Sequence, residues 1–213
     1  GAVNLAEAAR EQDAFLVQLS TDFVFDGNRS RPYAPGDTPA PLGVYGATKL
    51  AGEVAVQQIL GHYSAIVRTS WLYSSHGHNF VKTMLRLMKE RDAVRVVADQ
   101  IGTPTWAHGL AVAVWQIAGR TLSGIHHWGD GGVASWYDLA VAIQEEALSL
   151  GLLARAVPVL PIATANYPTP ARRPSYSVLD KTATWELLGG PPPHWRVQLR
   201  RMLQEYQGMR GDG

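Results

Sequence analysis

A hydroxyl, a phenol and an amine occur in this sequence at spacings that suit the reduction of a carbonyl group. Thr21 ends a short apolar run, and Tyr45 and Lys49 follow a proline-rich loop. Two side chains four residues apart in a helix lie on one face, one above the other. A free phenol has a pKa of about 10, and a neighbouring ammonium favours its ionised form. The Tyr45 and Lys49 pair therefore predicts a general acid.

The elements around these residues favour a parallel α/β sheet. The sequence predicts a helix over residues 2–12, a buried strand over 15–20, a long loop over 26–41 and a helix over 45–59. In open α/β sheets, ligands bind beyond the carboxyl ends of the strands. Ser20, Thr21 and Asp22 fall at that end of the first strand.

Helices and strands continue to alternate along the chain. We expect further strands over residues 65–70, 94–98, 124–128 and 157–162, and helices over 80–91, 105–118, 181–188 and 195–207, with residues 208–213 frayed. Ser135, with Asp138 three residues later, predicts the start of another helix. The Trp136–Tyr137 pair on that helix is expected to pack in the core. Residues 167–174 contain too many prolines for regular structure.

These elements predict an α/β fold. The expected form is a Rossmann-like doubly wound parallel sheet that lacks its N-terminal part, with a small mixed C-terminal substrate lobe. Residues 1–125 are predicted to form the C-terminal portion of an NAD(P)-binding domain with interleaved lobe segments, and residues 126–213 mainly the lobe. Because the chain opens on a helix that leads into a buried strand, we expect earlier βα units to precede it.

Composition excludes several classes of protein. The chain has 46% hydrophobic residues, a formal net charge of +1 and no cysteine. A charge balance near zero argues against a nucleic-acid partner, and the lack of cysteine excludes disulfides and thiolate metal sites. No apolar run approaches the roughly 18 residues of a membrane span, and the start of the chain has no signal-peptide pattern. We expect a cytoplasmic protein that binds neither membrane nor nucleic acid.

Several motifs resemble the extended short-chain dehydrogenase/reductase superfamily and, within it, the dTDP-4-dehydrorhamnose reductase family. They lie at residues 20–27 (STDFVFDG), 45–53 (YGATKLAGE), 68–73 (RTSWLY), 79–81 (NFV), 99–105 (DQIGTPT), 135–137 (SWY) and 167–174 (YPTPARRP). The resemblance spans nearly the whole chain. It implies an oxidoreductase that uses NADPH or NADH to reduce the C4 keto group of a dTDP-linked 4-keto-6-deoxysugar to dTDP-L-rhamnose.

The resemblance also implies a role for individual residues. Tyr45 resembles the proton donor to the keto oxygen, Lys49 the residue that holds the nicotinamide ribose, and Thr21 the hydroxyl that binds the reacting oxygen. Leu19 and Ser20 are expected to offer backbone groups to the nicotinamide. The implied substrate contacts are Thr21, Asp22, Trp71, Asn79 and Arg173, with Arg173 of the Arg172–Arg173 pair as the clamp on the pyrophosphate.

Phe23 favours reduction over elimination. Related 4,6-dehydratases place Asp-Glu directly after the threonine, whereas Phe23 follows Asp22 here. Without the second carboxylate, elimination loses a proton carrier. Two alternatives stay open, which are a non-catalytic regulatory subunit that binds the nucleotide sugar or NADP, and a sugar-nucleotide epimerase.

One glycine-rich segment imitates a dinucleotide-binding fingerprint. Residues 129–134 (GDGGVA) fit the spacing, but no acidic residue follows about 20 positions later, so a structural turn is the better interpretation. With no acceptable copy in the chain, we expect the polypeptide alone to bind NAD(P)H poorly. His76 with His78 and His126 with His127 do not have metal-ligand spacing, and no metal site is predicted. A divalent-metal requirement, the cofactor preference and a homodimeric state are left open.

Overall fold

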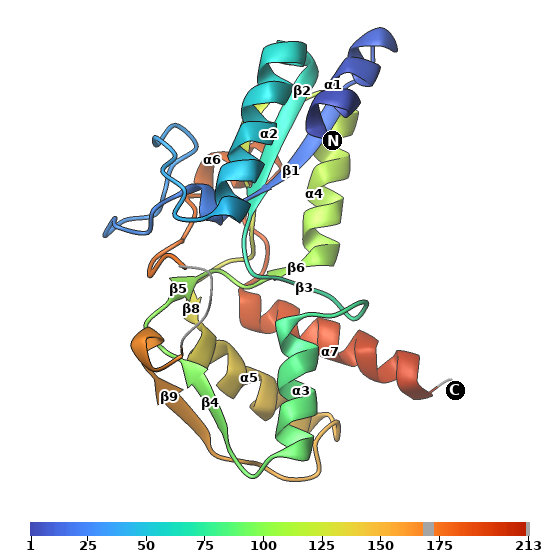
Figure 1. Ribbon diagram of the computed structural model, residues 1–213. Coiled ribbons are helices and arrows are strands. Elements are labelled where there is room, and N and C mark those ends of the chain that lie inside the picture. Colours follow the sequence, from blue (N-terminus) through green and yellow to red (C-terminus); the bar gives the residue numbers. More distant parts are fainter. Residues whose placement is uncertain (168–172, 212–213) are drawn as a thin grey trace.

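A three-stranded parallel sheet forms the upper part of the molecule in Figure 1. The structure is a computed structural model that describes residues 1–167 and 173–211. The strands run in the order β1-β2-β7, and their bounds are Leu16–Thr21 for β1, Ser64–Thr69 for β2 and Gly124–His127 for β7. Because all three are parallel, their carboxyl ends meet at the same end of the sheet.

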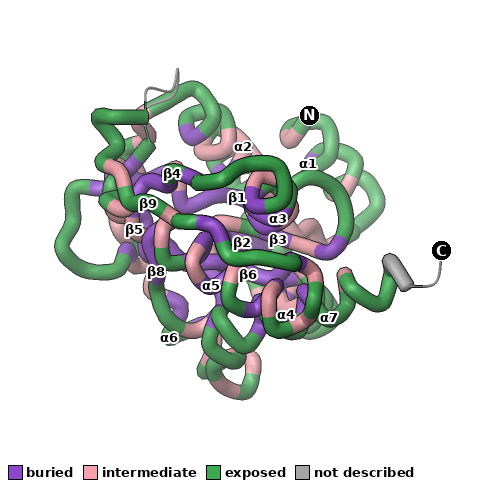
Figure 2. Tube along the Cα trace, turned by 90° about the horizontal axis from the view of Figure 1, so that it is seen from below, coloured by how far each residue is buried: buried purple, intermediate pink, exposed green. Residues whose placement is uncertain are grey.

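Helices cover both faces of this sheet. The alternation of β2 sends Ile66 toward one face, where it packs with Val56, and Val67 toward the other, where it packs with Leu110. All six residues of β2 are buried, and Figure 2 shows the strands enclosed by more exposed helices. This confirms the predicted doubly wound α/β arrangement. The covering helices are α1 (Ala2–Glu11) and α2 (Val44–Leu60) on the first face and α4 (Ala107–Gly119) on the second.

A second lobe lies below the sheet in Figure 1. Its core is an apolar cluster that includes Met88, Leu139, Ile143 and Leu199. The cluster draws on residues both before and after position 125, so the domain division at that position stays a prediction. The elements around it are α3 (Phe80–Glu90), α5 (Trp136–Ser149), α7 (Trp195–Gly211) and the parallel pair β4 (Val94–Val97) and β9 (Val159–Ile162).

Short elements connect the two parts. Helix α5 begins at a capping box in which Ser135 and Asp138 satisfy each other's backbone N–H groups, as the sequence predicts. The connecting elements are the parallel pair β3 (Leu72–Tyr73) and β6 (Thr105–Trp106), the antiparallel pair β5 (Ile101–Gly102) and β8 (Ala134–Ser135), the helix α6 (Thr182–Leu187), and the 3-10 turns η1 (Asp22–Val24), η2 (Gly61–Tyr63) and η3 (Thr164–Asn166).

Several predicted boundaries were wrong. The strand expected over residues 157–162 begins at Val159. The helix expected from residue 105 begins at Ala107, because Thr105 and Trp106 pair with β3 as strand β6. The fraying expected from residue 208 is not observed through 211, because α7 continues to Gly211. The single Gly208 costs this helix only about 1 kcal/mol relative to alanine, which does not end it. The proline-rich residues 168–172 lie outside the described part of the chain.

Within residues 1–167 and 173–211, no helix is both long and apolar enough to cross a membrane.

Candidate active site

The predicted catalytic residues meet at the carboxyl end of β1. Thr21 is the last residue of β1, and its hydroxyl accepts a hydrogen bond from the Phe23 N–H at 3.2 Å, which starts the 3-10 turn η1. Tyr45 lies in the first turn of α2, whose N-terminus rests directly on that turn. A Cβ at Gly46 would stand 2.1 Å from the Phe23 carbonyl oxygen, so only glycine permits this approach.

Tyr45 and Lys49 lie one helical turn apart on α2. The Tyr45 side chain is 58% exposed, and its ring meets Phe23 edge-on with the centroids 6.0 Å apart. The Lys49 ammonium donates a hydrogen bond to the Leu19 carbonyl at 2.7 Å, so the helix is tied to the end of β1. The phenol therefore stands free to act on a ligand while its helix is held in place.

A cavity of about 290 Å³ brings together five of the predicted site residues. They come from β1, η1, α2, the segment after β2 and the end of the proline-rich segment 167–174. These residues are Thr21, Asp22, Tyr45, Trp71 and Arg173. The rest of the wall is mostly apolar and consists of Phe23, Leu72, Tyr73, Phe80, Trp136 and Leu139.

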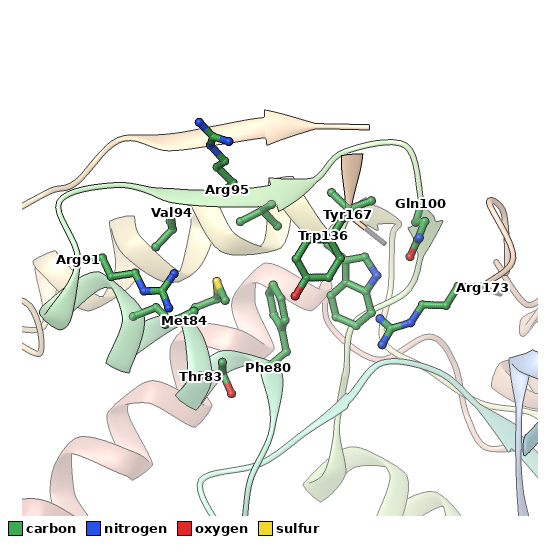
Figure 3. Close-up of a pocket in the computed structure, with 13 residues that line it drawn as sticks. Phe80, Thr83, Met84, Arg91, Val94, Arg95, Gln100, Trp136, Tyr167 and Arg173 are labelled. Carbon is green, nitrogen blue, oxygen red and sulfur yellow. The ribbon is translucent and has the colours of Figure 1, made fainter. Parts of the chain in front are cut away.

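A second cavity of about 360 Å³ adjoins the first. Phe80, Trp136 and Arg173 line both, so the two form one continuous binding region. Figure 3 shows Arg173 beside Trp136, with Arg91 at the far end of the second cavity. The other residues that line it are Thr83, Met84, Leu87, Val94, Arg95, Val96, Val97, Gln100 and Tyr167.

Asp22 carries an unusual carboxyl group. It is 2% exposed, its Oδ1 accepts from the Thr21 hydroxyl at 3.1 Å, and its Oδ2 makes no hydrogen bond of ordinary geometry within the described residues. Burial raises the pKa of Asp22 to about 7, and the hydroxyls of Ser177 and Thr21 offset this only in part. A carboxyl group that is partly protonated near neutral pH can therefore donate as well as accept a hydrogen bond in this cavity.

Asp22→Asn is expected to remove a pH dependence of stability. A carboxyl whose pKa is raised on folding stabilises the protein below pH 4 and loses that contribution as the pH rises through about 7. As the pH rises from 4 to 8, the parent should therefore lose stability relative to the variant. The difference between their free energies of unfolding should change by on the order of 4 kcal/mol in total. Urea unfolding at a series of pH values measures this difference. A constant difference across that range would contradict the assignment.

Trp71 and Trp136 stack face to face in the wall of the first cavity. Their ring centroids are 3.6 Å apart and their planes differ by 5°. Trp136 also packs against the lobe core, as expected, but the sequence did not indicate that it would line both cavities. It becomes a candidate binding residue.

A buried ion pair beneath Ser20 was also missed from the sequence. Glu53 and Arg68 are 1% and 2% exposed, and Arg68 Nη2 lies 2.6 Å from Glu53 Oε2. The Ser20 hydroxyl donates a hydrogen bond to the same carboxylate. The Ser20 side chain therefore connects the end of β1 to α2. Burial and the neighbouring guanidinium lower the pKa of His127 to about 3, which keeps that imidazole neutral beside Arg68. The available signal was the spacing of Glu53, four residues after Lys49 on the same helix face.

Asn79 lines neither of these cavities, although its neighbour Phe80 lines both. Its side-chain oxygen accepts from the Lys82 N–H at 3.2 Å and caps α3, and its amide donates to the Ser74 carbonyl at 2.7 Å. It does not line the cavity that contains Tyr45. Leu19, in contrast, is 41% exposed at the end of β1. The substrate contact of Asn79 and the cofactor contact of Leu19 stay predictions.

The glycine-rich turn at residues 129–134 has a structural role. Asp130 is fully buried and its Oδ2 accepts from the Trp106 N–H at 2.9 Å, while Lys181 donates to the Asp130 carbonyl. A Cβ at Gly132 would stand 2.5 Å from His194, so the turn is packed against other protein groups. Burial raises the pKa of Asp130 to about 7, and the Gly131 N–H donates to the Pro193 carbonyl at 3.2 Å, so both groups serve contacts within the protein.

The sheet and the site define a Rossmann-type oxidoreductase. Among the described residues, no group of three or more His, Cys, Asp or Glu is arranged to hold a metal. The chain belongs to the family described as RmlD substrate binding domain, whose profile matches residues 1–208.

Several similar proteins carry the name dTDP-4-dehydrorhamnose reductase. The dTDP-4-dehydrorhamnose reductase of Aggregatibacter actinomycetemcomitans is 43% identical over 208 residues, which are 95% of this chain and 70% of that protein. The Escherichia coli K12 enzyme of the same name is 41% identical over 94% of this chain and 69% of its own. A crystal structure of the Bacillus anthracis enzyme in complex with NADP has a TM-score of 0.89 at 40% identity, and covers 96% of this chain and 70% of that one.

The fold alone is shared more widely. A UDP-glucose 4-epimerase of Thermus thermophilus has a TM-score of 0.78 at 20% identity, with 97% of this chain and 68% of that chain covered. Proteins of different activity thus share this architecture, and the residues at the site must distinguish between them.

Proposed function

We propose that this chain carries the catalytic and substrate-binding residues for NAD(P)H-dependent reduction of dTDP-4-dehydro-6-deoxy-L-mannose to dTDP-L-rhamnose. The observation that carries the proposal is the cavity in which Thr21 and Tyr45 meet, with Lys49 one turn behind Tyr45. Identity of about 40% to dTDP-4-dehydrorhamnose reductases over most of the chain supports it.

The residues at the end of β1 fit a nicotinamide cofactor. Leu19 is partly exposed there, and the phenol and ammonium of α2 lie on the same side of the strand end. Tyr45 and Lys49 would hold the nicotinamide ribose by hydrogen bonds, and Leu19 and Ser20 would contribute backbone groups. When bound, the dinucleotide supplies the hydride that forms the new C4–H bond.

The protein supplies a proton and the orientation. As C4 accepts the hydride, negative charge develops on its oxygen, and Tyr45 donates the proton that converts this oxygen to a hydroxyl. The Thr21 hydroxyl, which donates to Asp22 Oδ1 in this structure, would turn to donate its hydrogen bond to the same oxygen and fix its position. Phe23, which packs edge-on against the Tyr45 ring, stands where elimination would need a second carboxylate.

The two joined cavities fit a nucleotide sugar. The sugar would occupy the cavity beside Tyr45, and the nucleoside the cavity between α3 and β4, which contains both apolar side chains and Arg91 and Arg95. Arg173 lies where the two meet, which is the place of the pyrophosphate in such a molecule. A cytoplasmic location and a homodimeric state stay predictions.

The proposed reaction is tested by its stoichiometry. The protein is incubated with NADPH and dTDP-4-dehydrorhamnose, and NADPH oxidation and dTDP-L-rhamnose are measured together. One NADPH should be consumed for each product molecule. An epimerised sugar without net NADPH oxidation, or tight binding of both ligands with no turnover, would overturn the proposal.

Arg173→Gln is expected to weaken dTDP binding by about 10-fold to 100-fold, because a charge-assisted hydrogen bond contributes roughly 1.5–3 kcal/mol. Binding of thymidine, which lacks the pyrophosphate, should change little. Isothermal titration with both ligands measures the two affinities. Arg86→Gln is the matched control, because Arg86 pairs with Glu90 on α3 and lines neither of the two cavities. Equal losses for the two variants would remove Arg173 from the pyrophosphate site.

A further inference from the structure

Trp71 has a backbone conformation that is unusual for its residue type. Its φ is +46°, in the left-handed region that large side chains rarely adopt. Such strain costs on the order of 1 kcal/mol and persists where neighbouring contacts enforce it, often at functional sites. The contacts that hold Trp71 in this conformation therefore indicate the function of its side chain.

Hydrogen bonds fix the backbone on both sides of this residue. The Ser70 hydroxyl donates to the Thr103 carbonyl at 2.9 Å, and the Thr105 N–H donates to the Trp71 carbonyl at 3.2 Å. Both partners belong to the segment 99–105, which the sequence singled out as a motif but to which it gave no role. This segment therefore serves as the support for Trp71.

The same segment passes directly against the indole. A Cβ at Gly102 would stand 2.5 Å from both Nε1 and Cε2 of Trp71 and 2.8 Å from Cζ2. The φ of Gly102 is not in the left-handed region, so space and not backbone conformation requires a glycine here. An alanine would force either the indole or the strand to move by about 1 Å to restore ordinary contact.

The short strand pair of β5 and β8 carries both neighbours of the Trp71 indole, which are Gly102 and Trp136. Gly102 of β5 pairs with Ala134 of β8, and Ile101 pairs with Ser135, the residue before Trp136. Trp136 covers the indole at a centroid distance of 3.6 Å. The Trp71 indole therefore lies between the backbone of Gly102 and the indole of Trp136. The pairing of β5 with β8 fixes these two neighbours relative to each other.

We propose that Gly102 is a positioning residue that sets substrate recognition by admitting the Trp71 indole to its place in the wall of the cavity that Tyr45 also lines. This inference rests on the proposed function, since it assigns the cavity to the sugar. Gly102 touches the indole and does not line the cavity itself. Its replacement is therefore expected to act through Trp71.

The test compares Gly102→Ala with Gly119→Ala. A Cβ at Gly119 meets nothing within 4 Å, so this control makes the same chemical change without the contact. For Gly102→Ala we expect loss of the exciton signal of the stacked indoles in circular dichroism, and a fall in kcat/KM on the order of 10²-fold, as for a 1 Å misplacement. The affinity for dTDP alone should stay within about twofold. Gly119→Ala should match the parent in all three measurements.

A double variant separates the effect on Trp71 from damage to the strand. Alanine lacks the ring atoms that a Cβ at position 102 would meet, so Gly102→Ala should have little further effect on stability or kcat/KM in a Trp71→Ala background. An undiminished effect in that background, or an unchanged exciton signal and kcat/KM in the single variant, would overturn the proposal. The exciton signal needs no substrate, so failure of the proposed reaction in the parent protein would be seen separately.

Discussion

Tyr45→Phe is expected to lower kcat by about 10²-fold to 10⁴-fold, the range that a positioned general acid contributes. The variant keeps the ring that packs against Phe23 and loses only the hydroxyl that reaches the cavity. The affinity for the nucleotide sugar should therefore stay within about twofold. Initial rates of NADPH oxidation give kcat, and isothermal titration gives the affinity in the absence of turnover.

Tyr63→Phe is the matched control for this experiment. Tyr63 is as exposed as Tyr45 but lies in the 3-10 turn η2, on neither of the two joined cavities. Its variant should retain the parent rate. If Tyr45→Phe turns over at that rate as well, the proton comes from another group, and Asp22, with its raised pKa, becomes the candidate to examine.

The meeting of the candidate catalytic residues was predictable because it depends on local patterns. An apolar run followed by Thr21 indicates the carboxyl end of a buried strand, and the four-residue spacing of Tyr45 and Lys49 fixes their shared helix face. Parallel strands then bring their carboxyl ends together whatever the loops do. Thr21 and Tyr45 line one cavity in the structure, as these rules lead one to expect.

Residues that depend on long-range packing were not predictable in the same way. Trp136 has the position of a core residue on an amphipathic helix, and only the pairing of β5 with β8 shows that its ring reaches Trp71. Gly102 gives no sign in the sequence that an indole lies against it. Asn79 follows the motif pattern of a site residue, yet its side chain is used in a helix cap, which any asparagine before a helix can form.

The buried ion pair shows a further limit of local patterns. Arg68 lies within a strand whose other residues are mostly apolar, where a charge argues against burial. The structure resolves the conflict by placing Glu53 of α2 against the guanidinium, at a sequence separation of 15 residues. Two residues that look like surface charges in the sequence thus form the connection between the helix of Tyr45 and the central strand.

Arg68→Met is expected to lower the free energy of unfolding by about 3–5 kcal/mol, because it leaves the Glu53 carboxylate buried without its cation. A typical domain is stable by only about 5–15 kcal/mol, so this is a large fraction of the total. Adding Glu53→Leu should restore most of the loss, since a buried ion pair is often replaced by apolar residues at little cost. The restoration should be incomplete, because the Ser20 hydroxyl then lacks its acceptor.

Urea unfolding of the single and double variants measures both effects, and Arg200→Met supplies the control. Arg200 pairs with Glu146, also a buried carboxylate, but its own side chain is 59% exposed and Arg196 remains as a second cation. Its loss should cost no more than about 1 kcal/mol. Equal costs for Arg68→Met and Arg200→Met would mean that water reaches Glu53 when its partner is gone. In that case the connection beneath Ser20 would not be what holds α2, and with it Tyr45, against the sheet.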